Sequence, residues 1–144
     1  MSDFFTYNDG GRAEAGYKGK TGDCGVRAIA IATGKPYQDV YDMVKAFGGA
    51  ERPRRDGKRN SHPRTGVWMP TMKAIMEHLG WQWTPTMSIG SGCKVHVRPD
   101  ELPSGRLILR LTKHYAAFID GELHDTHDSS RDGSRCVYGY WSRD

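Results

Sequence analysis

Cys24 is the residue best placed to act as a nucleophile. It opens the run Cys24–Thr33 (CGVRAIAIAT), whose Ala and Ile residues indicate a buried helix that ends at Gly34, with Asp23 as the expected N-cap. At a helix N-terminus, unpaired backbone N–H groups and the helix dipole favour a thiolate over a thiol. The sequence therefore predicts an activated cysteine whose own N–H could contribute to an oxyanion hole. The alternative is a small buried residue that only starts the helix.

His114 and Asp125 are predicted to lie together on one β-hairpin. His114 begins the strand His114–Ile119 (HYAAFI), and Asp120-Gly121 forms a two-residue turn before a strand over residues 122–126. With that turn, the side chains of His114 and Asp125 lie diagonally on one face of the sheet. A turn longer by one residue would place Asp125 on the opposite face. The imidazole is the expected base for the cysteine, and the carboxylate would fix its tautomer.

The elements that would position these residues follow a simple order along the chain. Helices are predicted over residues 37–47 and about 70–79, and strands over residues 81–85, 93–98, 106–112 and 136–141. Residues 1–20 are polar and contain several glycines, so they are expected to form a loose leader. Helices followed by antiparallel strands predict one α+β domain over residues 1–144, with N-terminal helices packed on a C-terminal antiparallel sheet.

A known family shows a similar arrangement. Gly22-Asp23-Cys24 at a helix start, followed by residues 114–121 (HYAAFIDG) and Leu123-His124-Asp125, resembles the papain-like cysteine peptidase superfamily over about residues 18–126. The resemblance is strongest to its small, single-domain bacterial and phage-borne members. It implies a papain-like fold in which Cys24 attacks a carbonyl, His114 moves the proton and Asp125 orients His114. It also implies a protein or peptide substrate and no cofactor, with peptidases the commonest case and deamidases and isopeptidases also represented.

Two positions depart from the pattern of that superfamily. Its members commonly carry an oxyanion-hole Gln about six residues before the cysteine, where this chain has Lys18. Lys18, Thr21 and Asn8 are the candidate replacements for that donor. Gly25 stands where an aromatic residue usually follows the cysteine. An inactive papain-like fold is therefore an alternative.

A zinc site is the main chemical rival. Cys93 and His96, together with His124 and His127, are residues of the types that bind zinc. The hairpin register directs His124 and His127 to opposite faces, so no metal site is predicted. Cys93 and Cys136 are expected to be reduced thiols packed on strands, because three cysteines without a secretion signal argue against a disulfide framework.

The net charge of +4 lies in one segment. Residues 51–66 contain two acidic side chains and six cations, namely Arg52, Arg54, Arg55, Lys58, Arg59 and Arg64. The segment has no large apolar side chain, so it is expected to be a solvated, mobile loop. It could flank a substrate cleft. The alternative function from another class is a non-catalytic module that binds an acidic protein or a nucleic acid through this loop.

Length and composition set the remaining expectations. The chain has 144 residues, of which 37% are hydrophobic, and no apolar run approaches the ~20 residues that cross a bilayer. The N-terminus lacks the features of a signal peptide. A cytoplasmic location without a membrane partner is therefore expected. The sequence does not determine the oligomeric state.

Overall fold

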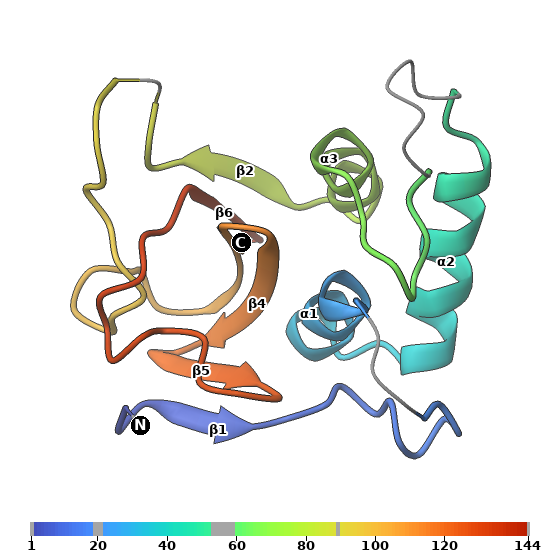
Figure 1. The fold of residues 1–144 in the computed structure, drawn as a ribbon, viewed down its shortest axis with the longest axis horizontal. Helices are drawn as coiled ribbons and strands as arrows, with labels where there is room; N and C mark the ends of the chain where they lie inside the picture. Colours follow the sequence, from blue (N-terminus) through green and yellow to red (C-terminus); the bar gives the residue numbers. More distant parts are fainter. Residues whose placement is uncertain (1, 19–21, 53–59, 89, 144) are drawn as a thin grey trace.

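The computed structural model describes residues 2–18, 22–52, 60–88 and 90–143. Within these ranges the chain forms helices and strands in the order β1 (Phe5–Tyr7), α1 (Cys24–Thr33), α2 (Tyr37–Gly49), α3 (Met69–His78), β2 (Gln82–Pro85), β3 (Arg106–Leu111), β4 (His114–Ile119), β5 (Glu122–Asp125) and β6 (Gly139–Ser142) (Figure 1). The α+β class predicted from the sequence is confirmed.

The strands form one mixed sheet in the order β1-β5-β4-β3-β6-β2. β1 is parallel to β5, and the other neighbouring strands are antiparallel. The hairpin of β4 and β5 turns at Asp120 and Gly121, whose φ angles of 47° and 82° are both positive. Such a two-residue turn pairs Ile119 with Glu122, so the register predicted from the sequence is confirmed.

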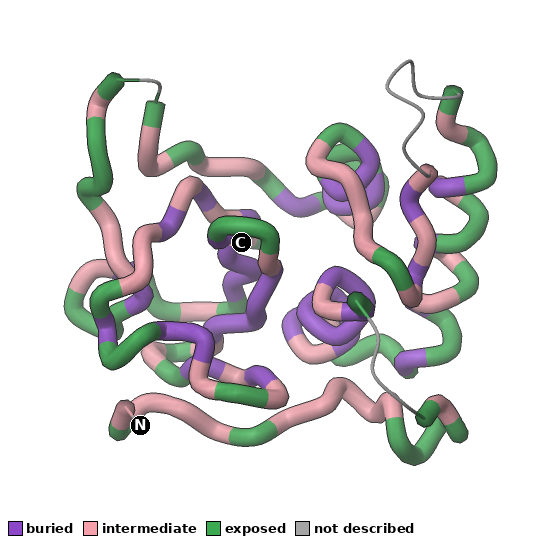
Figure 2. The backbone as a smooth tube through the Cα atoms, in the orientation of Figure 1, coloured by how far each residue is buried: buried purple, intermediate pink, exposed green. Residues whose placement is uncertain are grey.

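The three helices lie on one face of the sheet. α1 packs directly on β4 and β3, α2 lies on the outer side of α1, and α3 lies beside α2 and β2 (Figure 1). Seven of the ten residues of α1 are buried, as expected for a mostly apolar helix in the interior of the molecule (Figure 2). The core between helices and sheet contains Val26, Ile29, Val44, Met72, Ile75, Ile108, Tyr115 and Trp141.

The opposite face of the sheet is covered by loops instead of helices. Side chains from β3, β4 and β5 pack there against residues of the segments before β3 and before β6. These buried residues are Val97, Leu102, Leu107, Leu109, Leu111, Ala116, Phe118, Leu123 and Val137. The loops lie on the side of the molecule away from the helices (Figure 1). This second core explains why a short chain can support a sheet of this size.

The N-terminal segment is not the loose leader expected from its composition. Phe5–Tyr7 forms β1 beside β5, which also makes the sheet mixed instead of wholly antiparallel. The ring of Phe4 packs edge-on against Phe118 at a centroid distance of 6.3 Å. Burial of this aromatic side chain offsets the ordering of a segment that is otherwise polar.

The C-terminal half differs from the predicted strands in one region. The expected strand over residues 93–98 is wrong, because only His96 forms an isolated bridge there, with Cys136. β6 accordingly begins at Gly139 instead of residue 136. This segment serves as a cover for the second core, since Val97 is fully buried although its neighbours form no ladder.

The segment after α2 is better anchored than its composition suggests. α2 continues through Gly49, two residues beyond its predicted end, and Gly48 lies against the backbone of Ser61. A Cβ atom at Gly48 would lie 2.0 Å from the Ser61 carbonyl oxygen. The expectation that this segment takes no part in packing is therefore wrong for residues 60–66, which include the buried Ser61. Arg54, Arg55, Lys58 and Arg59 lie outside the described residues.

No helix within the described ranges is both long enough and apolar enough to cross a membrane.

Candidate active site

Cys24 is the first residue of α1, as predicted. Its thiol is free and partly exposed. The helix ends at Gly34, whose φ of 76° is the left-handed conformation expected of a glycine C-cap. The expected capping role of Asp23 is wrong, because its side chain makes no hydrogen bond to the helix N-terminus. The carboxylate binds Arg27 and Tyr37 instead, and these buried donors compete successfully with the backbone amides.

His114 and Asp125 are in direct contact. His114 Nε2 lies 2.7 Å from Asp125 Oδ2, and both side chains are almost completely shielded from solvent. The diagonal placement predicted from the hairpin register accounts for this contact, since His114 opens β4 and Asp125 closes β5. The bond leaves Nδ1 of the imidazole free to face another group.

Cys24 is a second neighbour of His114. Its side chain interacts with His114, and its sulfur also accepts a hydrogen bond from the backbone N–H of Tyr115. Burial raises the pKa of the Cys24 thiol, but His114, this N–H and the charge of Arg27 together bring the pKa below its ordinary value. Burial lowers the pKa of His114, whereas the bonds to Asp125 and Cys24 raise it to about 9. Both shifts favour a thiolate beside an imidazolium.

Asp125 is held in its ionised form by several donors. Its Oδ2 accepts a hydrogen bond of 2.8 Å from the Ser129 hydroxyl, and its Oδ1 accepts one of 2.7 Å from the backbone N–H of Thr126. Burial raises the pKa of Asp125, but the bonds from His114, Ser129 and Thr126 bring it below the ordinary value. A carboxylate satisfied in this way keeps one orientation and can support a positive charge on the imidazole.

Arg27 is a component that the sequence analysis did not identify. It lies one helical turn after Cys24, with only 11% of its side chain exposed, and it contacts Asp23 as well as Asp125. Its Nη2 is 3.5 Å from Asp125 Oδ1. The signal in the sequence was an arginine within an otherwise apolar helix, which requires a buried partner.

A cavity of about 250 Å³ opens beside the thiol. Among the described residues it is lined by Cys24, Asn60, Thr65, Gly66, Val67, Trp68, Met69, Arg110, Lys113 and Tyr115. A bound group in this cavity would therefore lie next to the candidate nucleophile. Nothing in the sequence indicates this wall, because its residues come from two distant parts of the chain.

The candidates for an oxyanion donor do not gather at the thiol among the residues described. Lys18 is exposed, and its carbonyl accepts a hydrogen bond from Arg64. Asn8 donates toward His124 and accepts from Gly10, so its amide is occupied elsewhere. Thr21 lies outside the described residues. The backbone N–H of Cys24, which has no partner within α1, is the donor that remains at the site.

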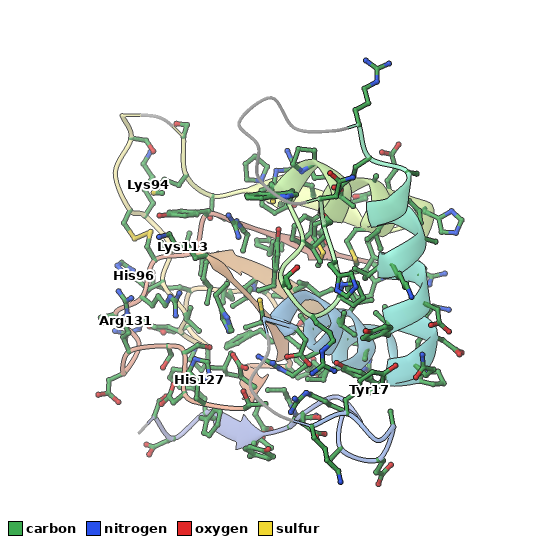
Figure 3. The ribbon with its side chains drawn as sticks, turned by 45° about the vertical axis from the view of Figure 1, so that its right-hand side comes forward. Tyr17, Lys94, His96, Lys113, His127 and Arg131 are labelled. Carbon is green, nitrogen blue, oxygen red and sulfur yellow. A yellow bond between two sulfur atoms is a disulfide. The ribbon has the colours of Figure 1, made fainter. Side chains whose placement is uncertain are left out.

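The four residues considered for zinc are not arranged as a metal site. Cys93 forms a disulfide with Cys136, at a Cα separation of 5.8 Å, and His96 Nε2 lies 3.5 Å from Cys93 Sγ (Figure 3). The expectation of reduced thiols at both positions is therefore wrong. It relied on the odd number of cysteines, but pairing two of three still leaves Cys24 free.

His127 lies near the candidate site. It is exposed, and its ring centre is 5.3 Å from that of His114 (Figure 3). Ligand atoms of His114, Asp125 and His127 all lie within 4.8 Å of one another, so these three residues could hold a metal ion. Two of them are the residues that contact each other beside Cys24, and such a metal would block the imidazole.

The basic segment contributes one described cation near this region. Arg64 donates a hydrogen bond of 3.0 Å to the Lys18 carbonyl and lies over the ring of Tyr17 at 5.7 Å. Arg52 is exposed at the beginning of the basic segment, shortly after α2 ends. Neither side chain lines the cavity beside Cys24.

Comparisons with known proteins do not assign this arrangement to a family. No family model matches the chain, and neither the curated proteins nor the solved structures include a match.

Proposed function

We propose that the protein is a thiol hydrolase of amide bonds, of the papain-like kind, in which Cys24, His114 and Asp125 act together. The observation that carries the proposal is the 2.7 Å contact between His114 and Asp125, together with a free cysteine at the start of α1 whose pKa His114 lowers. The helix N-terminus beneath Cys24 and the raised pKa of His114 both support the ion pair that such an enzyme needs.

The reaction follows from the position of each group. The Cys24 thiolate attacks the carbonyl carbon, and the electron pair of the C=O bond moves to the oxygen. His114 donates its proton to the leaving nitrogen as the C–N bond breaks, which produces a thioester and a free amine. His114 then removes a proton from water, which attacks the thioester and releases the acid and the thiol. Asp125 keeps the imidazole oriented throughout.

The first experiment tests the reactivity of Cys24. The rate of its alkylation by iodoacetamide is measured by mass spectrometry between pH 5 and pH 9. We expect the rate at pH 6 to exceed that of an ordinary cysteine peptide, because the pKa of Cys24 is lowered, and the His114→Ala change to lower the pH 6 rate by roughly tenfold. His78→Ala is the matched control, because His78 lies on α3 beside Phe47 and away from the thiol.

Two outcomes would count against a thiol enzyme. One is an alkylation rate at pH 6 no higher than that of an ordinary cysteine peptide. The other is an unchanged rate in the His114→Ala variant. Either result would favour the non-catalytic binding module. Hydrolysis itself is tested by incubating the protein with a peptide library, with Cys24→Ser as the inactive reference.

A further inference from the structure

The cavity beside Cys24 has a rigid apolar wall. Val67 packs against Gly25, where an added Cβ would lie 3.1 Å from its side chain, and the Val67 carbonyl accepts a hydrogen bond of 3.0 Å from the Tyr115 hydroxyl. The backbone N–H of Trp68 is bound by the Ser61 hydroxyl at 2.9 Å. This wall is therefore fixed to both α1 and β4. A volume of about 250 Å³ suits one residue-sized group better than an extended segment.

Two cationic residues, Arg110 and Lys113, also line the cavity. The guanidinium of Arg110 is stacked over the ring of Tyr115 at 4.9 Å, which holds it in place at the end of β3. Lys113 lies in the turn between β3 and β4, directly before His114 (Figure 3). Both residues are therefore within reach of a group bound in the cavity.

These cations are not neutralised by the protein as far as the structure describes it. No aspartate or glutamate is among the described lining residues, and no described carboxylate forms an ion pair with Arg110 or Lys113. Two positive charges without a nearby acid, beside an apolar wall, match a ligand that is partly apolar and carries an anionic group. A planar guanidinium suits a carboxylate, with which it can form two parallel hydrogen bonds.

We infer that the residue of the substrate that enters this cavity carries a carboxylate bound by Arg110 and Lys113. The inference rests on the proposed function, because it assigns the substrate class of the same site. The carboxylate has two sources with the same chemistry, namely an Asp or Glu side chain or the C-terminus of a peptide chain.

Three alkylating probes test the inference and separate the two sources. They are bromoacetyl-glutamate amide, with an acidic side chain, bromoacetyl-glutamine amide, its neutral counterpart, and bromoacetyl-glutamine with a free terminal carboxylate. The second-order rate of Cys24 modification at pH 7 is measured for each by mass spectrometry. We expect at least one acidic probe to react roughly tenfold faster than the neutral one, as charge-assisted hydrogen bonds imply. The faster acidic probe identifies the source.

Charge-removing variants assign the preference to the two cations. Arg110→Gln and Lys113→Gln should each reduce the ratio of the acidic-probe rate to the neutral-probe rate at least about threefold, both rates being measured in the same variant. His114 is present in every variant and attracts anionic probes in each of them. Its charge therefore cannot explain a difference between variants in the preference for the acidic probe. Arg143→Gln and Lys35→Gln are the matched controls, since both residues are exposed and border a different cavity, near the C-terminal end of α1.

The outcomes separate this inference from the proposed function. Equal rates with all three probes, together with fast modification that depends on His114, would overturn the carboxylate specificity alone. A preference that persists in both Arg110→Gln and Lys113→Gln would overturn the assignment to these cations. Slow modification by every probe and by iodoacetamide would instead contradict the proposed function. Lys113 lies in an exposed turn, so Lys113→Gln is expected to fold. If Arg110→Gln does not fold, the Lys113→Gln variant still tests the inference.

Discussion

Arg27 Nη2 lies 3.5 Å from Asp125 Oδ1, so an ion pair between buried side chains joins the helix that begins at Cys24 to the strand that ends at Asp125. The same guanidinium binds Asp23, which in turn accepts a hydrogen bond from Tyr37 of α2. One buried arginine therefore fixes the relative position of the thiol and the carboxylate across the sheet. The imidazole of His114 lies between them.

Removing this arginine should destabilise the whole protein. Arg27→Met leaves the buried Asp23 and Asp125 with fewer partners, and loss of one partner of a buried ion pair costs about 3–5 kcal/mol. We expect a lower free energy of unfolding in urea by that amount, with partial recovery in Arg27→Lys. Arg131→Met is the control, because Arg131 is exposed. A loss below about 1 kcal/mol would show that the ion pair is not needed.

Asp125→Asn should reduce the reactivity of Cys24 while preserving the shape of the site. The change removes the negative charge that raises the pKa of His114, so the pKa falls toward its ordinary value. A shift of one unit alters the population of the ion pair about tenfold. We therefore expect alkylation of Cys24 near pH 8 to slow by roughly that factor. Asp128→Asn is the control, since Asp128 binds Ser2 and Ser130 and not His114. Equal effects of the two variants would contradict the orienting role.

The pKa of His114 also predicts how stability depends on pH. The pKa is raised from its ordinary value of 6.5 to about 9 on folding, so the folded protein holds this proton more tightly than the unfolded chain. The contribution is complete below pH 6.5 and declines as the pH rises to about 9. We expect the difference in free energy of unfolding between the natural protein and His114→Gln to shrink over this interval, as measured by urea titrations. A difference that stays constant or grows would contradict the ion pair with Asp125.

The hairpin and the helix around the candidate site could be predicted because local signals determine them. Asp120-Gly121 selects a two-residue turn, and this turn alone sets the register that brings Asp125 to His114. The apolar run after Cys24 ends at Gly34, which fixes the length of α1. In both cases the information lies within a few residues of the element.

The parts that could not be predicted depend on contacts between distant segments. Asp23 and Arg27, four residues apart, have the spacing of an ordinary helix pair, and nothing nearby indicates that Asp125 is a third partner. β1 forms only because β5 offers it an edge, and the Cys93–Cys136 disulfide joins loops separated by 43 residues. The polar composition of residues 60–66 also gives no indication that they are anchored to α2. That anchoring depends on the close contact between Gly48 and Ser61.

Two adjacent glycines at the end of α2 test that anchoring. Gly48→Ala should lower the free energy of unfolding by about 1–3 kcal/mol, because its Cβ would overlap the Ser61 carbonyl and displace the segment that borders the cavity. Gly49 has open space around its Cβ position, so Gly49→Ala should stabilise the helix by up to about 1 kcal/mol. Thermal unfolding of both variants measures the difference. Similar values would show that Gly48 does not contact the loop closely.

The disulfide gives the last prediction, which separates Cys24 from the other two cysteines. Titration of the unfolded, non-reduced protein with a thiol reagent should detect one thiol, and titration after reduction should detect all three cysteines.

Closing a loop of 43 residues contributes about 4 kcal/mol in the chain-entropy description. Replacing both Cys93 and Cys136 by serine should therefore lower the free energy of unfolding by up to that amount. Because neither residue lines the cavity, the double variant should retain the reactivity of Cys24 towards iodoacetamide under native conditions. Three thiols without reduction would show that the two loops are held together without a disulfide, by their backbone hydrogen bonds and the packing of Val97 and Val137.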